Sequence, residues 1–167
     1  MAATVQINEY NGAGATETTN ITNSNMGSTD AVNLNPVSFP ITNGNNSYEK
    51  WQKFDVTAMG GSSLINNLQV WRTTALGANA THLTNARTSS YGGAASFTTP
   101  TASASAVATQ TMPSSDPGAA NLGIGGSLSG SLSGTGKSDY LVHQIQTTAS
   151  ATAGATCTMN YQYDETA

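Results

Sequence analysis

The stretch from Ser47 to Thr73 constrains the fold most, because two runs within it alternate apolar and polar side chains every second residue. The apolar positions are Phe54, Val56 and Ala58 in the first run and Leu64, Leu68 and Val70 in the second, where they alternate with Ile65, Asn67 and Gln69. A period of two is typical of strands with one buried face. Gly60 and Gly61 lie between the runs and predict a connecting loop at 59–63. We therefore predict an antiparallel hairpin that forms the centre of a sheet.

The composition extends this prediction to the whole chain. Charged residues are 8% of the 167 residues, against about 25% in an average globular protein. Threonine, valine and tyrosine favour strands, whereas the abundant asparagine, glycine and serine favour the turns between them. The length suits one domain. We predict a single all-β domain over residues 1–167, a β-sandwich or jelly roll of about six to eight strands with long polar loops.

Two long segments stand apart from the expected strands. Residues 15–47 read as an extended N-terminal arm or loop, and residues 96–136 as low-complexity strands and loops rich in serine, threonine and glycine. The arm carries widely spaced apolar residues that could anchor it across its own domain or across a neighbour: Val32, Leu34, Val37, Phe39 and Ile41. We expect such segments to become fully ordered on contact with a partner.

The charge and the apolar content exclude several partners. With a net charge of −4 and five lysines and arginines in total, the chain lacks the basic surface that nucleic acids and acidic membranes require. No apolar stretch approaches the roughly 18 residues of a spanning helix. The first residues contain neither a basic nor an apolar signal region, so we expect no secretory signal.

Residues with catalytic or metal-binding chemistry are scattered along the chain. We interpret His143 as a core or interface imidazole, His82 as a solvated loop residue and Cys157 as a small buried hydrophobe. The glycine-rich run at 123–134 lacks the spacing and the lysine of a phosphate-binding loop. Asp139 precedes a strand and could cap a turn. The sequence thus predicts no catalytic, cofactor-binding or metal residues, and no small-molecule substrate.

The two tryptophans are the most informative aromatic residues. Trp51 and Trp71 each point away from the apolar face of their run, so on neighbouring strands they would share one face. Such a pair could form a sugar-stacking platform, a protein interface or the floor beneath a folded-over loop. We take Trp51, Trp71, Phe39 and Tyr91 as candidate interface residues.

Short signatures along most of the chain resemble small virion structural proteins of tailed bacteriophages. They are Asn35-Pro36, Pro40-Ile41-Thr42, Gly44 to Trp51, Asn67 to Trp71, Ser138 to Val142 and Tyr161 to Glu165. The resemblance implies a non-enzymatic β-sandwich of the virion, of the head decoration (cement) type, assembled in the host cytoplasm. It implies no functional residues, because that class works through surfaces.

The expected partners are the major capsid protein or other virion proteins, together with further copies of this chain. Two alternatives remain open at this point: a tail- or fibre-associated component, and a glycan- or receptor-binding module that uses the tryptophans and Tyr91. An enzyme such as a polysaccharide depolymerase is disfavoured, because no carboxylate pair or nucleophile set stands out.

Overall fold

A computed structural model describes residues 1–12, 14–88 and 107–167. The described residues form β-strands joined by turns and irregular segments, with no helix among them. The strands are β1 (Thr4–Asn11), β2 (Thr16–Thr18), β3 (Lys50–Ala58), β4 (Leu64–Arg72), β5 (Ala80–Thr88), β6 (Gln110–Thr111), β7 (Ser131–Leu132), β8 (Gly136–Lys137), β9 (Tyr140–Thr147) and β10 (Met159–Thr166).

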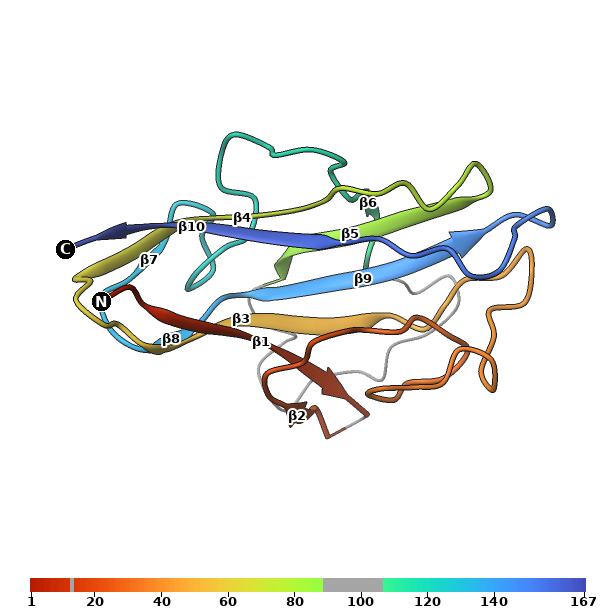
Figure 1. Ribbon diagram of the computed structural model, residues 1–167, viewed down its shortest axis with the longest axis horizontal. Helices are drawn as coiled ribbons and strands as arrows, with labels where there is room; N and C mark the ends of the chain where they lie inside the picture. Colours follow the sequence, from red (N-terminus) through yellow and green to blue (C-terminus); the bar gives the residue numbers. More distant parts are fainter. Residues whose placement is uncertain (13, 89–106) are drawn as a thin grey trace.

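The strands are arranged in two sheets of unequal size (Figure 1). The larger sheet has the order β2-β1-β3-β9-β5-β6, with the short β8 also paired to β3. The smaller sheet has the order β10-β4-β7. Apolar residues of both sheets pack into one core between them, which confirms the predicted all-β sandwich.

The strand order defines the type of sandwich. Counting only the six long strands, the first, second, fifth and fourth form one sheet and the third and sixth form the other. This is the arrangement of strands A-B-E-D and C-F in a constant-type immunoglobulin sandwich. The seventh strand of that arrangement, G, would pair with β10 and has no counterpart among the described residues. The jelly-roll form of the prediction is therefore not confirmed.

The predicted hairpin is wrong in its pairing. Both strands exist, and the loop between them falls at 59–63 as expected. However, β3 pairs with β1, β8 and β9, whereas β4 pairs with β10 and β7. The loop instead carries the chain from one sheet to the other. Period-two alternation indicates one buried face but cannot indicate which strand lies alongside, because the same pattern suits a strand in either layer.

Because of a β-bulge in β4, the side-chain direction predicted for Ile65 is wrong. Two residues, Asn67 and Leu68, lie opposite the single residue Tyr163 of β10. Asn67 has a positive φ of 52°, a conformation that asparagine tolerates better than most residues. Because the bulge shifts the alternation by one residue, Ile65 points into the core together with Leu68, rather than away from it.

The arm at 15–47 folds back on its own domain. It begins with β2 on the edge of β1, and its later residues bond to the sheet: the Ile21 amide donates to the Ile7 carbonyl at 2.9 Å. Leu34 is the one buried member of the five expected anchors, while Val37 and Phe39 are exposed. The arm is thus ordered by contacts within the chain, which corrects the expectation that it orders on meeting a partner.

The glycine-rich run closes around a buried carboxylate. The backbone amide of Gly126, whose φ is 84°, donates to Asp139 Oδ1 at 3.0 Å. A Cβ atom on Gly123 would lie 2.3 Å from Asp139 Oδ2, so a larger residue there would displace the carboxylate. Burial raises the pKa of the Asp139 carboxyl, and the amide bond opposes part of that rise. The turn-capping prediction for Asp139 is confirmed.

The bulge yields a stability prediction. Replacing Asn67 by valine places a β-branched residue at positive φ, and we expect a loss of about 1–2 kcal/mol in the free energy of unfolding. Asn67→Gly accepts the same φ without strain and serves as the control, changing stability by less than about 0.5 kcal/mol. Urea unfolding of the three proteins measures both values. Equal stability of the valine and glycine variants would show that the bulge does not constrain this position.

Candidate functional site

The two tryptophans lie on opposite outer faces of the sandwich. Each points away from its own core residues, as the sequence predicted. Because β3 and β4 belong to different sheets, those two outward directions are opposite. Trp51 is completely buried, with 0% of its surface exposed, whereas Trp71 is half-buried on β4. The shared tryptophan face predicted from the sequence is therefore wrong.

Trp51 is the floor beneath a folded-over loop. It packs with Tyr10, Val142 and Ala108 in a second buried cluster on the outer face of the larger sheet. The neighbouring Glu49 accepts a hydrogen bond from the Ala108 amide at 2.8 Å, which holds the loop in place. Burial raises the pKa of the Glu49 carboxyl, and these backbone bonds oppose part of the rise. This observation matches the loop-cover alternative for Trp51.

An aromatic cluster surrounds Trp51 that the sequence did not indicate. Tyr140 contacts both Trp51 and Tyr10 edge to face, with ring centroids 5.3 and 5.2 Å apart. The Lys53 ammonium lies 4.2 Å from the Tyr140 ring centroid, a cation–π distance. The rings come from β1, β3 and β9, strands far apart in the sequence. Their meeting therefore depends on strand order, which alternation does not reveal.

The clearest exposed apolar feature is the turn at 35–40, here called the arm tip. Val37 is 87% exposed and Phe39 is 44% exposed. The turn is held by Asn35, whose side-chain oxygen accepts from the Val37 amide at 2.9 Å and whose carbonyl accepts from the Phe39 amide at 3.0 Å. The Phe39 carbonyl in turn accepts from the Ser28 amide. Of the candidate interface residues, Phe39 is thus placed on the surface, whereas Tyr91 lies outside the described residues.

The arm reaches this position because a buried ion pair binds it to the sheet. Lys50 Nζ lies 3.1 Å from Glu9 Oε1, and each side chain is 1% exposed. The Ser24 hydroxyl of the arm donates to Glu9 Oε2 at 2.6 Å. The Lys50 ammonium also donates to the carbonyl of Ala31 in the arm. One ion pair therefore joins β1, β3 and two points of the arm.

The two histidines belong to the same buried network. Gln52 donates its amide N–H to Glu9, so its Oε1 is the acceptor facing His143 Nε2 at 3.2 Å. His143 must then donate from Nε2, which leaves its Nδ1 to accept from His82 Nε2 at 2.8 Å. Tyr161 of β10 also donates to Gln52 Oε1 at 3.1 Å. A directed chain of donors thus runs from His82 to the Glu9 carboxylate.

This network corrects one histidine prediction and confirms the other. His82 is buried on β5 beside β9, rather than solvated in a loop. His143 is a core imidazole, as predicted. Burial, with a smaller contribution from the Arg72 cation, lowers the pKa of His82 to about 4. Burial and the neighbouring His82 hold the pKa of His143 well below its usual range. Both rings are neutral near pH 7.

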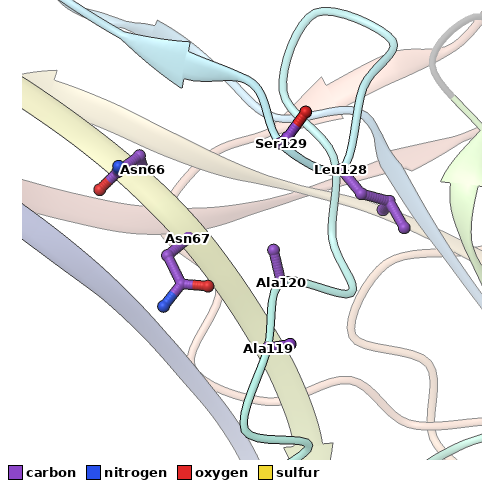
Figure 2. Close-up of a pocket in the computed structure, with 6 residues that line it drawn as sticks. All are labelled: Asn66, Asn67, Ala119, Ala120, Leu128 and Ser129. Carbon is purple, nitrogen blue, oxygen red and sulfur yellow. The ribbon is translucent and has the colours of Figure 1, made fainter.

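A pocket beside β4 has a neutral lining. It has a volume of about 390 Å³. Figure 2 shows the residues that line it: Asn66, Asn67, Ala119, Ala120, Leu128 and Ser129. None of these side chains titrates near neutral pH, so this pocket offers hydrogen bonds and no acid–base group. Burial raises the pKa of the half-buried Cys157 thiol, which disfavours the reactive thiolate. Within the described residues, no three His, Cys, Asp or Glu side chains gather to hold a metal ion.

Comparison with known proteins identifies no relative of this chain. No protein-family model, curated protein or solved structure matches the chain. The described residues also contain no helix with the length and apolar character needed to cross a membrane.

The histidine pair predicts that stability falls in mild acid. The folded protein keeps both rings neutral, whereas an unfolded histidine binds a proton below pH 6.5, so the unfolded state gains protons first. Stability therefore decreases as the pH falls from about 6.5 towards the folded pKa of His82, about 4. Between pH 7.5 and 5 we expect a loss of about 1–2 kcal/mol per ring. His82→Gln should reduce the loss, and urea unfolding at both pH values measures it. An unchanged slope in this variant would contradict the prediction.

The buried ion pair predicts that substitutions of Glu9 and Lys50 have non-additive effects on stability. Lys50→Met leaves the Glu9 carboxylate buried without its cation, and we expect a loss of about 3–5 kcal/mol. Glu9→Gln together with Lys50→Met removes both charges and should be more stable than Lys50→Met alone, because no unpaired charge remains buried. Thermal unfolding measures stability, and limited proteolysis of residues 15–47 reports release of the arm. Additive losses in the double variant would contradict this account.

Proposed function

We propose that this protein is a non-enzymatic structural component of a bacteriophage virion, a head decoration protein that binds and stabilises the capsid shell. The observation that supports the proposal best is the arm tip. It presents Val37 and Phe39 to solvent from a turn already fixed by Asn35. A rigid apolar projection binds a partner with little further loss of conformational entropy.

The surroundings of the tip agree with a contact surface. Residues 35–40 are all exposed, and the two prolines among them restrict the backbone. The tip contains no charged residue, so burying it in an interface removes no charge from water. The apolar side chains can then fill a pocket on the capsid protein, as the central residues of interfaces do.

The glycan-binding alternative loses its main support from the sequence. It depended on Trp51 and Trp71 forming a stacking platform, but Trp51 is fully buried and Trp71 lies on the opposite outer face. A tail or fibre location is compatible with the same apolar tip. The two locations differ in the protein that the tip would bind.

Binding to purified heads tests the proposal. Val37→Ser with Phe39→Ser removes the exposed apolar groups, and we expect affinity for expanded heads that lack this protein to fall roughly a hundredfold. Because both side chains are exposed, the free energy of unfolding should change by less than about 0.5 kcal/mol. Thr22→Ala, at an exposed arm position away from the tip, is the matched control and should bind like the unchanged protein.

Two results would contradict the proposal. The first is unchanged affinity and unchanged thermal stabilisation of heads by the tip variant, which would remove the tip from the interface. The second is the absence of copies on the shell in density maps of mature particles, which would exclude the head role. Binding to purified tails but not to heads would support the tail or fibre alternative instead.

A further inference from the structure

The smaller sheet ends at a strand with an open edge. Within the described parts of the chain, β10 pairs with β4 on one side and with no strand on the other. That empty side is where strand G lies in a constant-type immunoglobulin sandwich. An edge strand with free backbone groups is a template for pairing with another chain.

The direction of the free backbone groups follows from the bonds at the two ends of β10. The Thr158 carbonyl accepts from the Thr73 amide, and the Thr166 carbonyl accepts from the Ser63 amide. Backbone groups of successive residues in a strand point to alternate sides. The even-numbered residues therefore bond towards β4. The odd-numbered ones, Met159, Tyr161, Tyr163 and Glu165, present their N–H and C=O groups at the open edge.

The larger sheet extends beneath this edge as an apolar ledge. Tyr163 of β10 contacts Phe54 of β3, with ring centroids 5.2 Å apart, so β10 lies over β3. The next strand outward is β1, and its inward residues Val5 and Ile7 pack against the core and are half-buried. Further along β1, the arm closes the ledge, with Ser24 bonded to Glu9.

The shape of the ledge selects its occupant. If a second copy paired its β10 with this edge, its own β3 would lie beneath that strand and would overlap β1. A single strand without a second layer avoids the overlap and covers Val5 and Ile7. Asp164 and Glu165 are exposed at one end of β10, and the chain carries a net charge of −4. The two carboxylates and the net negative charge of the chain all favour a neutral or basic segment.

We propose that the open edge of β10 binds one extended segment of a partner protein by strand addition. The segment carries apolar side chains at alternate positions towards Val5 and Ile7, and no acidic residue next to Glu165. Main-chain hydrogen bonds provide the affinity and the apolar ledge provides the selectivity. This inference rests on strand order and edge geometry, and it is independent of the proposed function.

Amide hydrogen exchange on the full chain tests the proposal. The probe is a capped peptide of about seven residues that alternates valine and threonine and ends in lysine. The control is the same peptide with N-methyl groups on the residues whose N–H groups would face β10. In the free protein the amides of Tyr161 and Tyr163 should exchange faster than those of Asn160 and Gln162, which bond to β4. Saturating probe peptide should slow Tyr161 and Tyr163 at least roughly tenfold, and the methylated peptide should not.

A variant links this protection to the ledge. Val5→Thr keeps the shape and strand preference of the residue but removes one methyl contact, and it should weaken peptide binding roughly fourfold. Thr18→Val lies on β2, away from the ledge, and should leave binding unchanged. Three outcomes would overturn the proposal: slow exchange of Tyr161 and Tyr163 in the free monomer, equal protection by the methylated peptide, or a dimer in sedimentation that already protects both amides.

Discussion

The buried ion pair between Glu9 and Lys50 is the interaction on which the rest of the arrangement depends. Two charges that are each 1% exposed are costly to remove from water, and burying them together is tolerated only if further donors and acceptors complete their hydrogen bonds. Here Ser24 and the Ala31 carbonyl supply two of those bonds, and both belong to the arm. The sheet therefore cannot bury this pair without the arm, and the arm has a fixed place because the pair needs it.

The arm held by this ion pair also covers part of the larger sheet that the smaller sheet leaves uncovered. The smaller sheet has two long strands, β10 and β4, against four in the larger sheet. At the apolar end of the interior, residues such as Phe54 and Leu68 from the two sheets pack against each other. At the other end the inward residues are polar, and the arm covers them in place of a further strand. The gap beside β10 is the part of the ledge that the arm does not reach.

The sequence predicted the fold class, the loop at 59–63 between β3 and β4 and the outward direction of each tryptophan. All of these depend on composition or on residues close together in the chain. It could not predict which sheet holds each strand, so the hairpin and the shared tryptophan face were wrong. For the same reason the sequence could not predict the contact between His82 and His143. His82 Nε2 lies 2.8 Å from His143 Nδ1 across β5 and β9, although the two residues are 61 positions apart in the chain. The bulge at Asn67 was missed because a single residue at positive φ leaves the composition of the strand unchanged.

The arm shows why a segment without regular structure can still present a defined surface. Its sequence is polar and rich in turn-forming residues, features that favour disorder when nothing binds the segment. Burial of Leu34 and the bonds to Glu9 and Lys50 fix its path, so the conformational entropy of the arm is lost during folding rather than during binding. Val37 and Phe39 then stand on a turn that is already ordered. A partner that buries them gains the apolar contact without also having to order the chain.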